Sequence, residues 1–359
     1  MVNQAKKTKI ALVGYKLAKG GLERVFSTVS ELLHDAGCEV SVIVLDDDIE
    51  YSYSGTLINL GHLSKFQKYF ELKKQLKTNQ FDYIIDFRHR INPWMELIFL
   101  HYIYSGFKII YTIHSSKMDS YLTDNKWVAK EILQNGYKII AVSNALNEKV
   151  KKVYGFEKGI VIPNAIAKNN SDLDYKEIQL PYKYCIAVGR LIASKQMGKL
   201  IETYSKSNLP NSEIHLVILG DGEEKLHLQK RIEELELCDF VHLLGFKKEV
   251  YSYMKNAEFL VLSSKHEGFS MVILEALNQS TPVISFDCET GPRELVQHGF
   301  NGLLVESQNF DALEKAMNRM IADAAFYKFC KENAKNSVNA FSAKTVGEKW
   351  LKLFNNNII

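Results

Sequence analysis

Two acidic side chains, Glu267 and Glu275, flank the start of an expected helix and could hold the hydroxyl groups of a sugar or a ribose. The helix is expected to open near Ser270, whose hydroxyl could cap it. The first amide groups of a helix have no partner inside it, so those of Ser270, Met271 and Val272 would form an anion site. The alternative is a capped surface helix with two solvated glutamates.

Two cations, Arg190 and Lys195, follow the apolar run 184–188. Arginine presents a planar fork to phosphate oxygens, and lysine adds a mobile point charge. At the end of a strand and beside a helix N-terminus, the two would form a clamp for a diphosphate. A solvated basic turn is the alternative interpretation.

Short apolar runs separated by helix-length segments must position these side chains. Such runs are typical of strands in a parallel sheet that is covered on both faces. The polar stretch 167–174 interrupts the pattern and predicts a linker between two doubly wound α/β domains. Ligands of such domains bind beyond the carboxyl ends of the strands, so the cleft between the domains is the expected site. The expected strands are 9–14, 39–45, 83–86, 108–113, 138–142, 159–162, 184–188, 214–219, 241–244, 259–262 and 282–285.

The composition is that of a globular protein, with 359 residues, 46% apolar and 24% charged. Five scattered cysteines without a close pair argue against a disulfide framework or a zinc site and favour a reducing compartment. The N-terminus lacks the apolar core of a signal peptide, and the longest uncharged apolar stretch, 97–107, is too short to cross a bilayer. We therefore expect a cytoplasmic protein.

The charge is distributed unevenly. Residues 1–165 hold 22 basic and 17 acidic side chains, giving +5, whereas the remainder gives −2 within the total of +3. This is too mild for a nucleic-acid binder, although it indicates that the first half meets something anionic.

The segment from Ser263 to Ile284 resembles the E-x7-E signature of retaining glycosyltransferases of the GT-B fold, specifically glycosyltransferase family 4. Seven residues separate Glu267 from Glu275, as in that signature. Five further segments match the family in the right order. They are the glycine turn at Gly20 and Gly21, the G-R-L-x-x-x-K run Gly189 to Lys195, the turn Gly220 to Gly222, the strand and loop 241–246, and the hinge segment 162–165.

The resemblance implies two Rossmann-like domains facing across a cleft. Residues 1–166 would bind the acceptor, 167–180 would be a linker, 181–340 would bind the nucleotide sugar, and 341–359 would be a C-terminal helix that packs back on the first domain. Ser270 stands where many members have Gly or Pro, and the loop 287–294 departs from the usual form except at Glu294.

The resemblance also implies the roles of the site residues. Glu267 would hold the transferred sugar, Glu275 the ribose, and Arg190 and Lys195 the diphosphate, while His114 would approach the sugar hydroxyls. The expected catalytic residues are Glu267, Arg190, Lys195 and His114. The expected donor-binding residues are Gly20, Gly21, Gly189, Arg190, Lys195, Gly220, Phe246, Glu267, Gly268, Phe269, Ser270, Met271, Val272 and Glu275.

The expected activity is transfer of a hexose from a nucleotide diphosphate sugar to an acceptor hydroxyl with retention of configuration. UDP is expected by family frequency, and neither a metal nor another cofactor is required. The acceptor would be a glycan or a lipid-linked sugar in polysaccharide, lipopolysaccharide or capsule assembly. The protein would then work in the cytoplasm, at the cytoplasmic face of the inner membrane.

Four other classes of protein share some of these features. A dinucleotide-dependent oxidoreductase would need G-x-G-x-x-G where the sequence has Gly14 to Gly21, although Asp46 has the offset of a ribose-binding acid. The D-x-D pattern at Asp46–Asp48 could hold a metal in sugar transferases of another fold, but a solvated loop is favoured there. A two-lobed solute-binding protein would not need the diphosphate clamp. A glycosidase would need a raised pKa that neither glutamate has a partner to provide.

The segment 65–77 is expected to form a helix that could approach anionic lipid. Arg88, His89 and Arg90, after the strand 83–86, could face an anionic acceptor group. A domain helix with solvated lysines is the favoured alternative. The expected apolar face comprises Phe66, Tyr69, Leu72 and Leu76, and the lysines around it are Lys65, Lys68, Lys73, Lys74 and Lys77.

Overall fold

The structure is a computed structural model that describes residues 7–166 and 178–354. The chain forms two compact units, unit 1 with residues 1–168 and 341–359, and unit 2 with residues 169–340. Of the expected linker 167–180, all but the last three positions lie outside the described residues.

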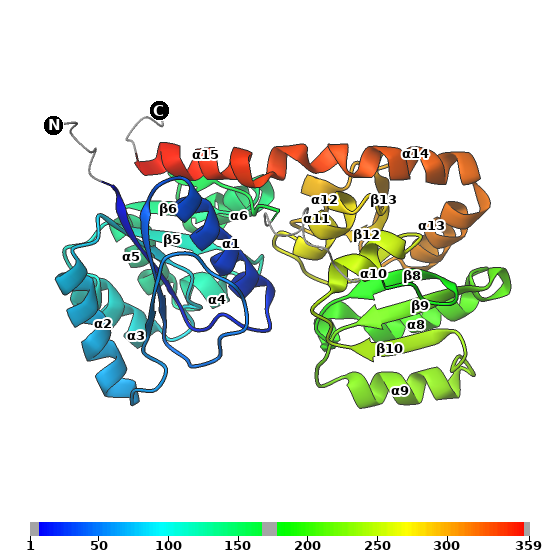
Figure 1. Ribbon diagram of the computed structural model, residues 1–359, viewed down its shortest axis with the longest axis horizontal. Helices are drawn as coiled ribbons and strands as arrows, with labels where there is room; N and C mark the ends of the chain where they lie inside the picture. The colour runs from blue at the N-terminus through cyan, green and yellow to red at the C-terminus, as the bar shows by residue number, and fades with distance from the viewer. Residues whose placement is uncertain (1–6, 167–177, 355–359) are drawn as a thin grey trace. The chain divides into compact units, whose positions relative to one another are not determined.

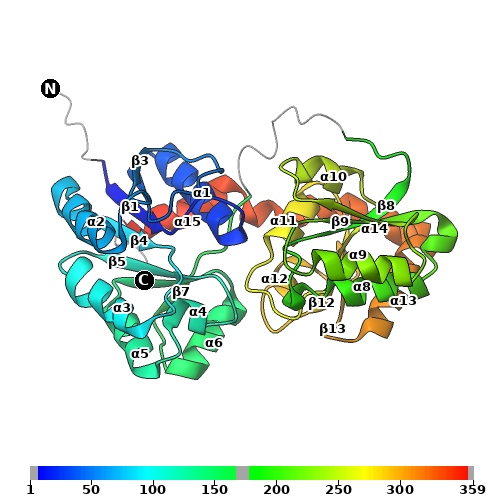
Figure 2. The ribbon, with the colours of Figure 1, turned by 90° about the horizontal axis from the view of Figure 1, so that it is seen from below.

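Unit 1 contains a seven-stranded parallel sheet of order β3-β2-β1-β4-β5-β6-β7. Right-handed crossovers place helices on both faces, and Figure 2 shows α1 and α15 on one side with α3, α5 and α6 on the other. Its elements are β1 (Lys9–Gly14), α1 (Gly21–Asp35), β2 (Glu39–Val44), β3 (Thr56–Asn59), α2 (Lys65–Asn79), β4 (Tyr83–Asp86), α3 (Pro93–Ile98), the π-helix η1 (Phe99–Ile103), β5 (Ile109–Ile113), α4 (Asp119–Leu122), α5 (Lys126–Asn135), β6 (Lys138–Ala141), α6 (Asn144–Tyr154), β7 (Gly159–Val161) and α15 (Ala343–Phe354).

Unit 2 contains a six-stranded parallel sheet of order β10-β9-β8-β11-β12-β13. Figure 1 shows its helices packed against the strands. Its elements are β8 (Lys183–Val188), η2 (Ala193–Lys195), α8 (Met197–Lys206), η3 (Pro210–Ser212), β9 (Ile214–Leu219), α9 (Lys225–Glu234), β10 (Val241–Gly245), α10 (Val250–Asn256), β11 (Leu260–Leu262), α11 (Met271–Asn278), β12 (Val283–Asp287), α12 (Pro292–Leu295), β13 (Gly302–Glu306), α13 (Phe310–Ala322), α14 (Ala324–Ala334) and η4 (Asn336–Phe341).

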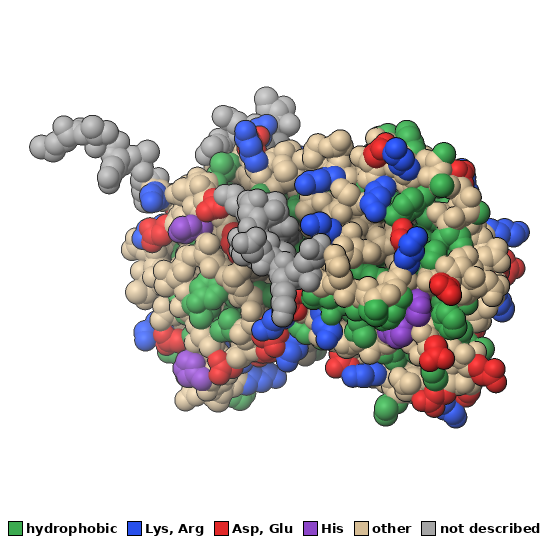
Figure 3. All heavy atoms as spheres, turned by 45° about the vertical axis from the view of Figure 1, so that its right-hand side comes forward, with side chains coloured by type: hydrophobic (Ala, Val, Ile, Leu, Met, Phe, Trp, Pro, Cys, Tyr) green, Lys and Arg blue, Asp and Glu red, His purple; other side chains and the backbone are tan. Residues whose placement is uncertain are grey.

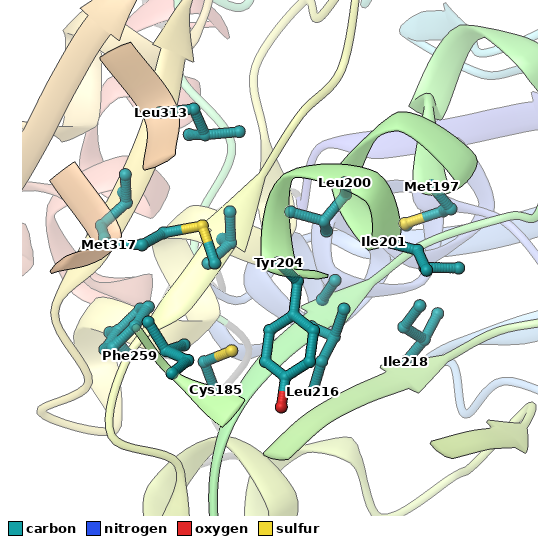
Figure 4. Packing of buried hydrophobic residues seen from close by; sticks show 14 of the residues in the cluster. Cys185, Met197, Leu200, Ile201, Tyr204, Leu216, Ile218, Phe259, Leu313 and Met317 are labelled. Carbon is teal, nitrogen blue, oxygen red and sulfur yellow. The ribbon is translucent and has the colours of Figure 1, made fainter. Parts of the chain in front are cut away.

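Apolar side chains of the strands and of the helices that cover them form the core of unit 2. Tyr204 of α8 lies in this core beside Leu216 and Cys185, as Figure 4 shows. Its buried hydroxyl donates to the carbonyl of Ile214 at 2.8 Å, which satisfies the polar end of the ring. The core therefore fixes the position of β8 and β11, the strands that lead into the candidate site.

The strand order of each sheet reverses at its centre, between β1 and β4 in unit 1 and between β8 and β11 in unit 2. Loops that leave the carboxyl ends of two such strands part in opposite directions and open a crevice in which ligands bind. The expected donor-binding loops 189–195 and 263–270 follow β8 and β11. These loops therefore lie at the point of the unit 2 sheet where the strand topology favours ligand binding.

The predicted class, two doubly wound α/β domains followed by C-terminal helices, is confirmed. The predicted strand list omitted β3 and β13, which are edge strands. Acidic and basic side chains are interspersed on the face that Figure 3 draws. Over residues 7–166 and 178–354, no helix is both long and apolar enough to cross a membrane.

Candidate functional site

The loops after β8 and β11 bring the expected phosphate-binding cation and sugar-binding acid together. Lys195 Nζ lies 2.5 Å from Glu267 Oε1, although 72 residues separate them in the chain. The backbone fixes this approach, because Lys265 N donates to Ser194 O at 2.8 Å and Ser263 Oγ donates to Lys195 O at 2.9 Å. Both side chains are largely buried, with 20% and 10% of their surfaces exposed.

Arg190 presents an exposed side chain immediately after β8. Hydrogen bonds on both sides hold its backbone, from Gly189 N to Leu219 O at 2.9 Å and from Leu191 N to Asp221 O at 2.9 Å. The guanidinium therefore stands on a fixed base and can reach an anion in solvent. The role of Arg190 in a diphosphate clamp stays a prediction.

A close approach of two loops explains Gly220. Its φ is +145°, and a Cβ there would lie 1.8 Å from the carbonyl oxygen of Gly189. A side chain would push the loop that carries Arg190 out of place. Nearby, Phe246 follows β10 with 44% of its surface exposed, so its ring is available to a flat ligand such as a nucleobase.

Helix α11 begins one residue after Ser270, as expected, so its first amide groups lie at Met271 and Val272. The expectation that the Ser270 hydroxyl caps this helix is wrong, since the side chain makes no capping hydrogen bond. The Ser270 side chain is buried, and its backbone has the extended conformation that is usual at an N-cap. Gly268 and Phe269, which precede it, are buried as well.

Glu275 lies in the fifth position of α11 and is only 3% exposed. Tyr251 of α10 donates its hydroxyl to Glu275 Oε1 at 3.1 Å. Sequence analysis missed Tyr251, which precedes Glu275 by 24 residues and belongs to no recognised motif. The bond orients the carboxylate that is expected to hold the ribose.

Two buried polar atoms in the same loops have no hydrogen-bond partner among the described residues. They are Gln196 Oε1, just after Lys195, and Ser264 Oγ, just after β11. A buried polar group without a partner is costly, so a ligand or water is the natural partner here. Neither residue was among the expected site residues, although Ser264 lies inside the matched segment from Ser263 and Gln196 directly follows Lys195.

The expected site residues of unit 1 lie after β1 and β5. Gly20 is the N-cap of α1 with extended backbone, and a Cβ on Gly21 would meet open space. Neither ring nitrogen of His114 has a hydrogen-bond partner in the described part of the chain. Burial, followed by the charges of Arg90 and His89, lowers the pKa of His114 to about 3. The ring is therefore neutral near pH 7.

The expectation that Arg88 and Arg90 face an acceptor anion is wrong. Both are fully buried. Arg88 Nη2 lies 2.9 Å from Asp86 Oδ2 and 2.9 Å from Glu96 Oε2, and burial raises the pKa of Glu96 while Arg88 opposes that shift. Arg90 donates to backbone carbonyls, among them that of Thr112 at 2.6 Å. The network neutralises these cations inside unit 1.

No cluster of three or more His, Cys, Asp and Glu side chains in residues 7–166 and 178–354 is placed to hold a metal ion. The acids at Asp46 to Asp48 instead contact neighbouring polar side chains. Lys68 Nζ lies 3.4 Å from Asp46 Oδ1, and Lys16 Nζ lies 3.5 Å from Asp48 Oδ2. These contacts are those of a surface loop.

Two family models divide the chain between them. The family described as Glycosyltransferase Family 4 matches residues 19–169, and that described as Glycosyl transferases group 1 matches residues 171–337.

Two curated relatives extend the comparison. One from Campylobacter jejuni, named N-acetylgalactosamine-N,N'-diacetylbacillosaminyl-diphospho-undecaprenol 4-alpha-N-acetylgalactosaminyltransferase, is 28% identical over 96% of this chain and 98% of its own. Poly(ribitol-phosphate) alpha-N-acetylglucosaminyltransferase of Staphylococcus aureus is 25% identical over 63% of this chain. The match spans 46% of that relative's length.

Solved structures share the fold over nearly the whole chain. Anabaena HepE in complex with UDP and glucose superposes with a TM-score of 0.81 at 19% identity, covering 97% of this chain and 99% of its own. Sucrose-phosphate synthase from Thermosynechococcus elongatus gives a TM-score of 0.79 at 20% identity, covering 98% and 99%.

Proposed function

The chain belongs to glycosyltransferase family 4 and has the GT-B fold, and from this premise we propose that it transfers a hexose from a UDP-sugar with retention of anomeric configuration. The observation that carries the proposal is the 2.5 Å contact between Lys195 and Glu267 at the switch point of the unit 2 sheet. A cation suited to phosphate and an acid suited to sugar hydroxyls are held together there by backbone hydrogen bonds.

The proposed chemistry depends on stabilising the diphosphate as it leaves. Arg190, Lys195 and the first amides of α11 supply positive charge and hydrogen-bond donors, which stabilise negative charge that develops in the transition state. The leaving β-phosphate takes the proton of the acceptor hydroxyl on the same face of the sugar, so the configuration is retained. These cations replace a divalent ion, and no metal is required.

The acids position the donor. Glu267 holds hydroxyls of the transferred sugar, and Glu275, fixed by Tyr251, holds the ribose. In unit 1, Gly21 leaves the backbone open to a phosphate or sugar, while the space beside Gly20 is taken by the Glu23 carboxylate, whose side chain would have to turn aside. Neutral His114 can exchange hydrogen bonds with sugar hydroxyls.

We assign acceptor binding to unit 1 and donor binding to unit 2. The names of the relatives support a glycan or lipid-linked acceptor, since one is named for a diphospho-undecaprenol substrate and another for poly(ribitol-phosphate). The proposed setting is the cytoplasmic face of the inner membrane, in cell-surface polysaccharide, lipopolysaccharide or capsule assembly.

A donor screen tests this function. The protein is incubated with a panel of UDP- and GDP-hexoses, and release of the nucleoside diphosphate is measured with and without excess EDTA. We expect one UDP-hexose to be hydrolysed fastest, at an unchanged rate in EDTA. Complete loss in EDTA that Mn²⁺ or Mg²⁺ restores would refute the metal-independent clamp, and release from no donor by the folded protein would refute the assignment.

A further inference from the structure

Three aromatic side chains stand exposed at equivalent positions in unit 1. Phe66, Trp94 and Trp127 are each the second residue of a helix, namely α2, α3 and α5. Their exposed fractions are 88%, 77% and 61%. Exposing large aromatic rings to water is unfavourable. Three such rings at the second position of three helices therefore indicate a contact surface.

The parallel sheet puts these three helix starts at one edge. Each helix leads from the carboxyl end of one strand back to the amino end of a parallel one, so its first turn lies at the carboxyl edge. This is the edge at which doubly wound sheets bind ligands, and His114 lies there at the end of β5. The aromatic side chains therefore border the expected acceptor side of unit 1.

The exposed faces of these helices continue the surface. At about 100° per residue, Phe66 and Phe70 share a face of α2 with Lys73, Lys74 and Lys77. This face is turned away from Leu72 and Leu76, which are buried, so the expectation that Phe66 joins them on the packed face is wrong.

A second stripe lies beside the first. Trp94, Ile98 and Tyr102 follow each other at intervals of four residues along α3 and η1, and all three are exposed. Lys73 Nζ stands 3.2 Å from the centre of the Tyr102 ring, so the two stripes adjoin. We call Phe66, Phe70, Trp94, Ile98, Tyr102 and Trp127 the aromatic rim.

The charge around the aromatic rim is positive. Helices α2, α3 and α5 and the π-helix η1 carry seven lysines and three glutamates. One of these acids, Glu96, is buried in the ion pair with Arg88. Apolar tips surrounded by flexible cations suit a bilayer surface, where rings enter the interface and lysines meet anionic headgroups.

We propose that the aromatic rim docks unit 1 on an anionic lipid bilayer and so places the carboxyl edge of its sheet at the depth of the lipid headgroups. Together with the proposed function, on which this step rests, the docking selects a lipid-linked acceptor over a polymer free in solution. The reacting hydroxyl of such an acceptor lies just above the headgroups, within reach of that edge.

Tryptophan fluorescence tests the docking without donor or acceptor. The chain has three tryptophans, of which Trp94 and Trp127 belong to the aromatic rim, whereas Trp350 of α15 is 3% exposed. Vesicles of phosphatidylcholine with phosphatidylglycerol should shift the emission to the blue, and brominated lipid should quench it. The double variant Trp94→Phe/Trp127→Phe should still sediment with vesicles but lose both signals.

Two further variants separate insertion from charge. Phe66→Ser/Phe70→Ser should weaken binding to these vesicles about tenfold, since apolar burial is lost. Lys73→Glu/Lys74→Glu/Lys77→Glu should abolish the preference for anionic over neutral vesicles. The control Leu226→Ser removes an 84% exposed side chain of α9 in unit 2 and should change nothing. The proposal would be overturned if the parent protein did not bind vesicles, or if Phe66→Ser/Phe70→Ser bound them as well as the parent. Either result would leave a protein as the partner of the aromatic rim.

An activity assay separates this proposal from the proposed function. Phe66→Ser/Phe70→Ser should hydrolyse the donor at the parent rate but transfer sugar more slowly to a lipid-linked acceptor in vesicles than the parent does. Equal transfer rates would overturn the lipid-linked assignment. If the parent binds vesicles but hydrolyses no donor, the docking holds and the proposed function fails.

Discussion

Lys195 and Glu267 have opposite expected partners, a phosphate and a sugar, yet they contact each other at 2.5 Å. A buried ion pair is costly to break, because removing either member leaves the charge of the other buried and unpaired. Under the proposed function, their contact would hold both side chains where the donor's diphosphate and sugar join. The pair would then fix this part of the donor site before the donor binds.

Replacing either cation should reduce turnover strongly while the fold survives. Lys195→Ala and Arg190→Ala should each lower kcat by a factor of about 100–1,000, because a donor that stabilises the leaving diphosphate is lost. Lys206→Ala, an exposed lysine at the end of α8, is the matched control and should keep the parent rate. Steady-state rates of nucleotide release measure the effect, and near-parent rates in both site variants would contradict the clamp.

The low pKa of His114 makes the stability of unit 1 depend on pH. Its pKa is about 3 in the folded protein against 6.5 without burial, so below pH 6.5 the unfolded chain takes up a proton that the folded protein does not. The free energy of unfolding of the parent should therefore fall, relative to His114→Gln, as the pH is lowered from 7 to 4. Urea unfolding at each pH tests this, and a constant difference between the two proteins would refute it.

At the scale of elements, residues outside the recognised motifs hold the candidate donor-binding segments in position. The loop after β8 is held by Leu219 and Asp221 of the neighbouring loop, and α11 receives its contact to Glu275 from α10. Because α10 contributes through one hydroxyl, that contribution can be tested separately from folding.

Removing the Tyr251 hydroxyl should weaken nucleotide binding. In Tyr251→Phe the carboxylate of Glu275 loses a hydrogen bond worth about 1–2 kcal/mol, so the Kd for UDP should rise about five- to thirtyfold. Tyr204→Phe also removes a buried hydroxyl from unit 2, but one that donates to the Ile214 carbonyl, and should lower stability without changing the Kd. Titration calorimetry with UDP distinguishes the two, and equal affinities would show that Glu275 needs no such support.

At the scale of the whole molecule, the chain returns to unit 1 after completing unit 2. Ile166 N donates to Phe341 O at 2.9 Å, and Tyr83 OH donates to Phe354 O at 3.1 Å. Helix α15 therefore belongs to unit 1. All three tryptophans lie in unit 1 as well, so their fluorescence reports its unfolding separately.

Breaking the buried network of unit 1 should be severe. Arg88→Met leaves Asp86 and Glu96 buried without their shared cation, which should cost about 3–5 kcal/mol. Lys151→Met breaks an exposed pair with Glu157 and should cost less than about 1 kcal/mol. Urea unfolding followed by tryptophan fluorescence compares them, and similar midpoints would contradict a structural role for Arg88.

The sequence by itself determined the central strands and the motif segments at their ends. Strands β1, β8 and β9 are buried on both faces, so each appears as a continuous apolar run that needs no knowledge of its neighbours. The edge strands β3 and β13 escaped prediction, although the edge strands β7 and β10 did not. In β3 the apolar run is limited to Leu57 and Ile58, and β13 begins at a glycine. Chemical type, spacing and the family resemblance also singled out Lys195 and Glu267, which the structure brings into contact, while their roles stay predictions.

Only the tertiary structure decided which charged and aromatic side chains are exposed to solvent or ligand and which are buried. Arg88 and Arg90 have the same sequence signature as solvated cations, but buried acids and carbonyls enclose them. Phe66 has the type of a core residue, yet its position at the start of α2 leaves it exposed, and the hydroxyl of Tyr251 reaches Glu275 from another helix. These outcomes depend on contacts between segments distant in the chain, which local patterns do not encode.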